Sequence, residues 1–308
     1  MEGTEQISTH FVQANGLTFE VDKCGRGDTL ALCLHGFPEL NFSWRYQLPM
    51  LAAAGYEAWA PNMRGYGASS RPLGVESYHL DRLMEDVAAL IDASGKESVV
   101  LIGHDWGAII AWQFAIEKRR RLEKLIICNV PHPGPLQRAL RTGFAQIRKF
   151  WYVLFFQIPR LPEFLLGLRG ARAIGDIIVN SCENPAMFPP EVINVFRENA
   201  MREGALTAML NYYRALLRGR KALAARGMPV IDVPTLMIWG EEDVALTRES
   251  TYGTEAYVSD FRIRYLPRVS HWVNQEAPEP VNAMIKAFLA GEPVPEVEWQ
   301  MQLVEPHD

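Results

Sequence analysis

The sequence predicts an α/β fold in which helices cover both faces of a mostly parallel sheet. Three observations predict it. Short apolar, β-branched runs alternate with helical patterns along the chain. The 308 residues, 48% hydrophobic and 22% charged, are enough for one large α/β domain with an insertion. The alternation stops once, between residues 131 and 234, and then resumes.

The expected strands lie in the first half of the chain and again near its end. Residues 10–14 and 17–22, separated by Asn15-Gly16, predict a hairpin at the sheet edge. Parallel strands are expected at 29–34, 56–60, 98–102, 125–130, 235–239 and 262–266. Apolar positions between Leu80 and Ile91 have helical spacing, and Gly95 is placed to end that helix.

Residues 131–234 contain helical patterns and loops but no convincing buried strand. Because strands of the same sheet are expected on both sides, this stretch is interpreted as an insertion and not as a second domain in sequence. Such an insertion would lie over the C-terminal ends of the strands, where open α/β sheets bind ligands. The sequence therefore predicts a core of residues 1–130 and 235–308 and a helical lid, or cap, of residues 131–234.

Charge and composition argue against several kinds of partner and location. The net charge of −5 gives no reason to expect a nucleic acid partner. Residues 1–10 lack an apolar signal region, and the strongly apolar run 150–158 is too short to span a membrane. The four cysteines have neither disulfide nor metal-ligand spacing, so we expect a cytoplasmic protein without a metal site. A homo-oligomer is compatible with the sequence.

The most informative motif is Gly103-His104-Asp105-Trp106-Gly107, which joins an expected buried strand to an expected helix. A strand, a sharp turn with glycines two residues either side of its apex, and a helix form the nucleophile elbow of α/β-hydrolases. The apex is usually serine, but here it is Asp105. A carboxylate is ionised at neutral pH and suits displacement at an sp³ carbon. A plain esterase is disfavoured because attack on an ester would give an anhydride.

An ester intermediate requires a base that activates water and an acid that orients this base. Asp243 follows the expected strand 235–239, and His271 follows the last strand. The order nucleophile, acid, histidine is the one this fold uses, so Asp105, Asp243 and His271 are the predicted triad. Glu241 and Glu242 compete for the acid role. Taken alone, His271 could be a loop histidine and Asp243 a helix cap.

The loop after strand 29–34 reads His35-Gly36-Phe37-Pro38-Glu39. In this fold that loop and the residue after the nucleophile each donate a backbone N–H to the oxyanion hole. The predicted donors are therefore Phe37 and Trp106. His35 and Gly36 could also serve only to form a turn, which is compatible with a loop that donates to the oxyanion hole.

An sp³ electrophile also needs a donor for its leaving oxygen. In segment 206–217, helical spacing places Tyr213, and not Tyr212, on the inward face. A tyrosine on an apolar stripe is more often plain core. An apolar pocket under the lid, which the lid's own core could equally explain, is suggested by Trp151, Phe155, Phe156, Met209 and Leu210.

Together these motifs resemble the soluble epoxide hydrolases of the α/β-hydrolase fold over most of the chain. The resemblance includes the elbow, the loop 35–39, the stretch Pro61-Asn62-Met63-Arg64-Gly65-Tyr66-Gly67-Ala68-Ser69 and Asn211-Tyr212-Tyr213-Arg214. The segment Tyr152-Val153-Leu154-Phe155-Phe156-Gln157-Ile158-Pro159 is similar to the first lid motif of that family.

The resemblance implies roles that spacing alone does not. Tyr152 and Tyr213 would donate hydrogen bonds to the epoxide oxygen, and the bond before Pro38 would be cis. Asp105 would open the ring, and water activated by His271 would release a vicinal diol. The implied partners are a small apolar epoxide and water, with no cofactor or metal. Ser270 departs from the family, which commonly has glycine before the histidine.

Two other functions fit parts of the pattern. A haloalkane dehalogenase would use the same aspartate nucleophile, but a halide leaving group favours indole or amide donors. Trp106 could serve, and the lid offers only Trp151 as a second indole. A non-catalytic binding protein on this fold is the other alternative, and such proteins often lose a triad member or an oxyanion donor.

Overall fold

The computed structural model describes residues 6–142 and 144–297 and contains a sheet with strand order β1-β2-β4-β3-β5-β6-β7-β8. Neighbours from β4 to β8 are parallel, whereas β1 and β2 are antiparallel at one edge. The strands are β1 (Ser8–Ala14), β2 (Leu17–Cys24), β3 (Thr29–Leu34), β4 (Tyr56–Pro61), β5 (Ser98–His104), β6 (Lys124–Cys128), β7 (Thr235–Gly240) and β8 (Phe261–Leu266). The mostly parallel α/β sheet expected from the sequence is confirmed.

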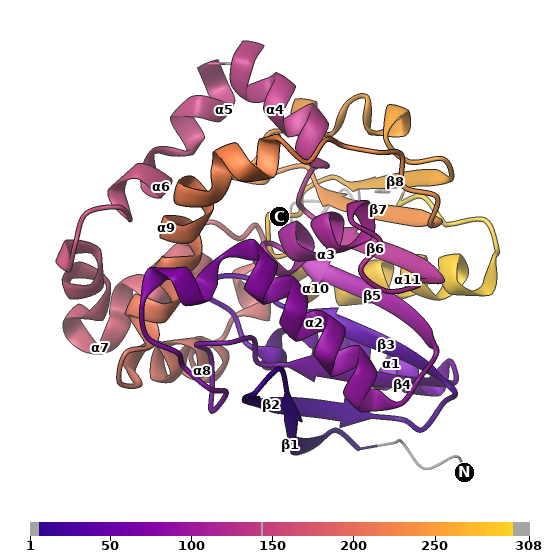
Figure 1. Ribbon diagram of the computed structural model, residues 1–308, viewed down its shortest axis with the longest axis horizontal. Helices are drawn as coiled ribbons and strands as arrows, with labels where there is room; N and C mark the ends of the chain where they lie inside the picture. Colours follow the sequence, from indigo (N-terminus) through magenta and orange to yellow (C-terminus); the bar gives the residue numbers. More distant parts are fainter. Residues whose placement is uncertain (1–5, 143, 298–308) are drawn as a thin grey trace, which may run out of the picture.

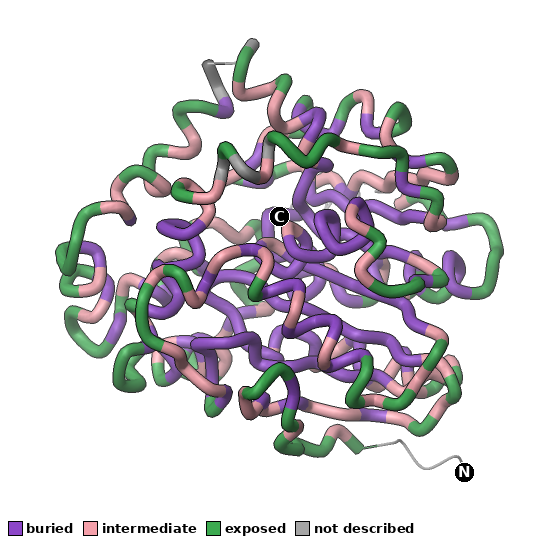
Figure 2. Tube along the Cα trace, viewed as in Figure 1, coloured by how far each residue is buried: buried purple, intermediate pink, exposed green. Residues whose placement is uncertain are grey.

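Helices cover both faces of this sheet (Figure 1). They are α1 (Gln47–Ala53), α2 (Leu80–Ser94), α3 (Trp106–Ile116), α10 (Val273–Glu276) and α11 (Pro278–Ala290). Alternate residues of one strand enter two different cores, because successive side chains of a strand point to opposite faces. Leu32 of β3 packs in the core that includes α2 and α3, and Cys33 packs in the core that includes α1 and α11. The buried centre and exposed rim that result are visible in Figure 2.

Most expected boundaries agree with the structure. Ala14 pairs with Leu17 across the Asn15-Gly16 turn, as expected for the hairpin. The helix α2 ends at Gly95, whose φ of 68° is a left-handed conformation that favours glycine. The strand β6 ends at Cys128, two residues earlier than expected, because Asn129 has a φ of 48° and leaves the extended conformation.

The described residues between β6 and β7 form helices that gather on one side of the sheet (Figure 1). We refer to these helices as the cap: α4 (Pro133–Thr142), α5 (Phe144–Lys149), α6 (Trp151–Phe155), α7 (Leu161–Val179), α8 (Pro190–Met201) and α9 (Ala205–Ala224). The residues Leu168–Ala171 interrupt α7 with non-helical backbone. Within residues 6–142 and 144–297, no helix is both long and apolar enough to cross a membrane.

Candidate active site

The turn between β5 and α3 presents Asp105 in a strained conformation, with φ 46° and ψ −118°. Such angles are rare for a residue with a side chain and persist only where surrounding packing imposes them. Two glycines provide that packing. A Cβ on Gly107 would lie 2.1 Å from the carbonyl oxygen of Leu34, and a Cβ on Gly36 would lie 2.3 Å from the Cβ of Asp105. The elbow, β3 and the loop after it therefore fit together only without these side chains.

The side chains of Asp105, His271 and Asp243 meet at the C-terminal ends of the strands. His271 Nδ1 lies 2.7 Å from Asp243 Oδ2, and His271 Nε2 lies 3.6 Å from Asp105 Oδ2. The imidazole ring is thus placed between the two carboxylates. With Asp243 accepting at Nδ1, the free position Nε2 faces Asp105.

Asp243 is held by several donors besides the histidine. Asn129 Nδ2 donates to Oδ2 at 2.8 Å, and the backbone N–H groups of Ala245 and Leu246 donate to Oδ1 at 2.7 and 2.9 Å. The competing carboxylates lie elsewhere: Glu242 is exposed and Glu241 pairs with Arg248. Asp243 is therefore the carboxylate that contacts His271 on the side away from Asp105.

Electrostatics favour the charged pair. Burial alone would lower the pKa of His271, but the charge of Asp243 and hydrogen bonding to Asp105 outweigh it, so this pKa lies well above its ordinary value. Burial would raise the pKa of Asp243, but the charge and hydrogen bond of His271 lower it on balance. These shifts favour a proton on His271 beside an ionised Asp243.

The backbone N–H of Phe37 donates to Asp105 Oδ1 at 2.6 Å. The Phe37–Pro38 peptide bond is cis, as the resemblance implied. Trp106 is the first residue of α3, directly after Asp105, and its indole packs edge-on against the ring of Tyr213 at 5.0 Å. Of the two residues expected at the oxyanion hole, Phe37 thus contacts the Asp105 carboxylate through its backbone N–H, and Trp106 follows Asp105 in the chain.

A cavity of about 490 Å³ extends from Asp105 and His271 into the cap. This volume is within the range of small-molecule pockets. Three aromatic residues expected at the pocket line it: Trp151, Phe155 and Phe156. Met209 and Leu210 do not, because both are fully buried in the core. The sequence could not separate these sets, since an apolar residue of a lid fits either place.

Tyr152 of α6 and Tyr213 of α9 also line the cavity, with ring centroids 5.9 Å apart. Burial, with a further contribution from the negative charge of Asp105, raises the pKa of both hydroxyls. Both tyrosines therefore keep their protons and remain hydrogen-bond donors. Tyr212, which the pattern placed away from the inside, is fully buried too, but its hydroxyl donates to the carbonyl of Arg64 at 2.8 Å.

The sequence analysis missed one polar residue of the cavity. Lys149 of α5 lines it, and its Nζ donates to the backbone carbonyl of Asp243 at 2.5 Å. No spacing signal distinguishes this lysine from its exposed neighbour Arg148. His104 of the elbow motif is fully buried, and its Nε2 lies 2.8 Å from the carbonyl oxygen of His271 while its Nδ1 contacts Glu39.

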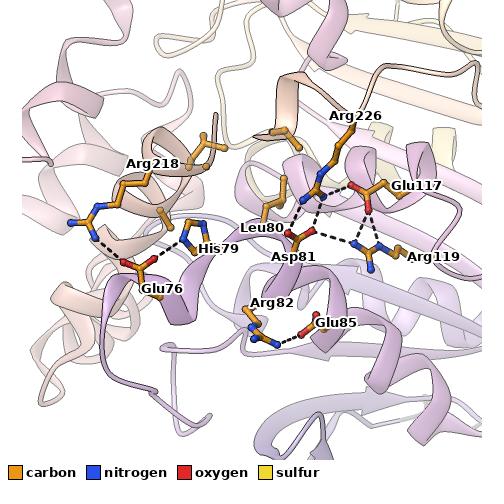
Figure 3. A pocket seen from close by; sticks show the side chains of 14 residues that line it. Glu76, His79, Leu80, Asp81, Arg82, Glu85, Glu117, Arg119, Arg218 and Arg226 are labelled. Carbon is orange, nitrogen blue, oxygen red and sulfur yellow. Dashed lines mark hydrogen bonds and ion pairs between the residues drawn. The ribbon is translucent and has the colours of Figure 1, made fainter. Parts of the chain in front are cut away.

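A second hollow of about 840 Å³ lies between α2, the end of α3 and α9, and it is lined mostly by charged groups (Figure 3). These groups pair with one another. Arg226 contacts both Asp81 and Glu117, and Arg119 contacts the same two carboxylates. Unlike the 490 Å³ cavity, this hollow contains no residue of the expected triad. Its ion pairs join the end of the cap to the core helices.

Several known proteins are similar to this chain in sequence and in fold. A model of the alpha/beta hydrolase family matches residues 31–284. The AB hydrolase superfamily protein YfhM of Bacillus subtilis is 38% identical over 92% of this chain and 98% of its own. Epoxide hydrolase 4 of Mus musculus is 35% identical over 91% of this chain and 79% of its own. A crystal structure of Bacillus megaterium epoxide hydrolase in complex with an inhibitor has a TM-score of 0.83, 29% identity and coverage of 91% and 100%.

Proposed function

The chain belongs to the alpha/beta hydrolase family, and from this premise we propose that it hydrolyses epoxides to vicinal diols through an alkyl ester on Asp105. One observation carries the proposal. The apex of the elbow is a carboxylate that faces His271 on one side, and the same cavity is lined by the hydroxyl-bearing Tyr152 and Tyr213. Nucleophile, base and donors for an alkoxide thus surround one apolar space.

In the first step the two tyrosine hydroxyls bind the epoxide oxygen. Asp105 Oδ2 attacks a ring carbon from the side opposite the C–O bond, that bond breaks, and its electron pair stays on the oxygen. One tyrosine transfers its proton to this oxygen and becomes a tyrosinate. The attacking oxygen is the one near His271 Nε2, so Oδ1 becomes the carbonyl oxygen of the ester and keeps its contact with the Phe37 N–H.

In the second step His271 must act as a base. The ester of Asp105 carries no charge, so one of the influences that raise the pKa of His271 is lost. The proton of His271 passes to the tyrosinate, and the neutral imidazole then takes a proton from water. The resulting hydroxide attacks the ester carbonyl, and the N–H groups of Phe37 and Trp106 stabilise the oxyanion. The ester C–O bond breaks and the leaving alkoxide takes the proton of the added hydroxyl group. The diol leaves, Asp105 is again a carboxylate, and His271 is again protonated.

The proposal extends to the substrate, the cap and the compartment. The aromatic lining of the cavity favours small apolar epoxides, and water is the second substrate. We assign residues 131–234 as the lid and residues 1–130 and 235–308 as the core that carries Asp105, Asp243 and His271. A cytoplasmic location fits the four cysteines, none of which forms a disulfide within the described part of the chain.

Haloalkane dehalogenation is the second candidate, because it would use the same nucleophile and base. Trp151, the second indole that it would require, has 66% of its surface exposed. Tyr152 and Tyr213 instead place hydroxyl donors in the cavity. This observation favours an alkoxide over a halide as the leaving group, since an alkoxide needs a proton.

The test is diol formation from a simple aromatic epoxide by the unmodified enzyme and by Asp105→Asn. We expect the substitution to abolish turnover, because the amide cannot attack carbon. Asp232→Asn is the matched control, since Asp232 forms an exposed ion pair with Lys118. Mass spectrometry of the variant excludes reversion of the amide to the acid. Undiminished diol formation by Asp105→Asn would contradict the proposal.

A further inference from the structure

The loop that carries His271 is joined to the cap through one buried carboxylate. Glu276 Oε2 accepts hydrogen bonds from the backbone N–H of Ser270, at 2.9 Å, and from its hydroxyl. Glu276 Oε1 accepts from the N–H groups of Glu183 and Asn184, at 2.6 and 2.7 Å. Those two residues follow α7 in the cap. Four donors thus converge on a side chain that is 4% exposed, and two come from each side.

The residue on the other side of His271 makes a second contact with the same part of the cap. Trp272 Nε1 donates to Ser181 Oγ at 2.9 Å. The catalytic histidine therefore stands between two residues, Ser270 and Trp272, that are both connected to cap residues 181–184. Ser270 is also where the sequence departs from the expected glycine, and its hydroxyl supplies one of the donors to Glu276.

The loop that carries Asp243 is joined to α5 of the cap. Gln146 Nε2 donates to the carbonyl of Ala245 at 3.0 Å, and Gln146 Oε1 accepts from the N–H of Thr247 at 2.9 Å. Lys149 Nζ, one turn further along, donates to the carbonyl of Asp243. Gln146 is 1% exposed, so both of its bonds are shielded from water.

The core holds the same two loops from the opposite side. Asn129 donates to Asp243, and His104 contacts the carbonyl of His271. The two loops that carry Asp243 and His271, whose side chains are 2.7 Å apart, are thus each hydrogen-bonded both to the core and to the cap. Proton transfer to His271 depends on the distance and angle of its hydrogen bonds. Loss of the hydrogen bonds from either the core or the cap would therefore let the imidazole ring move away from the position that transfer requires.

We propose that Glu276 and Gln146 are positioning residues through which the cap holds the Asp243–His271 pair in place for ester hydrolysis. This inference rests on the proposed function, and it extends the role of the cap beyond covering the pocket and supplying Tyr152 and Tyr213. Neither Glu276 nor Gln146 lines the cavity. They act through His271 and Asp243, so they affect the second chemical step and not the first.

The experiment separates the two steps by rapid quenching under single-turnover conditions with an aromatic epoxide, and by mass analysis of the ester on Asp105. For Glu276→Gln and Gln146→Ala we expect ester hydrolysis to slow by roughly 10- to 100-fold, the cost of about 1 Å of misplacement, while ester formation changes by less than about twofold. The ester should accumulate in both variants. Gln113→Ala is the matched control, because Gln113 is equally buried but bonds within its own turn of helix, to Glu117.

Two further measurements distinguish a positioning role of Glu276 from a general loss of structure. Ser270→Gly removes only one of the four donors to Glu276, so it should retain the fold and slow ester hydrolysis by less than Glu276→Gln. Thermal unfolding of each variant separates misplacement from global loss of structure. Equal slowing of both steps, or ester hydrolysis at the unmodified rate, would overturn the inference. Failure of the unmodified enzyme to form any ester would instead overturn the proposed function.

Discussion

Replacing Asp243 by asparagine tests whether Asp105 alone forms the ester while His271 and Asp243 act only in its hydrolysis. The change removes a charge but keeps the size of the side chain. Asp243 takes no part in the attack on the epoxide, so ester formation should continue. Ester hydrolysis should slow, because His271 becomes an imidazolium in that step and Asp243 is the carboxylate that stabilises it.

The magnitude follows from the geometry. Asp243 Oδ2 and His271 Nδ1 are 2.7 Å apart. At an effective dielectric constant of ~20, two unit charges at that distance attract by about 6 kcal/mol, which is an upper bound because the amide oxygen still accepts a hydrogen bond. A loss of about 3 to 5 kcal/mol in the step that charges the histidine corresponds to slowing by about 10²- to 10⁴-fold.

The assay measures the formation and the decay of the Asp105 ester in the same quenched samples. In Asp243→Asn the ester should form at nearly the unmodified rate and then persist. The double variant Asp243→Asn/Asn129→Asp places the negative charge at position 129 instead. It should recover part of the rate of ester decay, because Asn129 Nδ2 lies 2.8 Å from Asp243 Oδ2. Decay of the ester at the unmodified rate in the single variant would refute the reasoning.

Three further predictions concern the leaving oxygen, the elbow and pH. Tyr213→Phe should slow ester formation by at least about 10²-fold, measured as epoxide consumption, and an unchanged rate would contradict its role as a donor to the epoxide oxygen. Gly107→Ala places a Cβ 2.1 Å from the Leu34 carbonyl and should lower the free energy of unfolding by about 3 kcal/mol in chemical denaturation. Gly167→Ala, with 3.4 Å to its nearest neighbour, is the control and should be near neutral. Ester decay should accelerate as the pH rises through the pKa of His271, because only the neutral imidazole can accept a proton. The charge of Asp243 helps to keep this pKa above its ordinary value. A rate of ester decay that falls with rising pH would contradict this role.

Local patterns in the sequence predicted most of the sheet and singled out Asp105, Asp243 and His271, whose side chains the structure brings together. The strands are short apolar runs, so β3 begins and ends where the pattern indicates. The elbow is visible because its glycines and its apex are consecutive in the chain. Asp243 and His271 could be placed because each lies in the loop that follows a strand, and parallel strands of one sheet present their ends at a common edge.

The remaining parts of the site depend on contacts between distant segments. Glu276 and Glu183 are 93 positions apart, and nothing in the residues near either one indicates their hydrogen bond. Lys149 and Asp243 are 94 positions apart. Tyr212 was expected away from the inward face of its helix but is fully buried. A helix that packs between a core and a pocket is buried on more than one face, so a single apolar stripe does not include all of its buried residues.

The most direct test of the central claim is a single turnover of an aromatic epoxide in water enriched in ¹⁸O, with excess enzyme, followed by mass analysis of the peptide that contains Asp105. If a carboxylate opens the ring and water then attacks the ester carbonyl, the label enters the Asp105 carboxylate and the first diol is unlabelled. A labelled diol beside an unlabelled Asp105 peptide would show that water attacks the epoxide directly, and the covalent mechanism would be wrong.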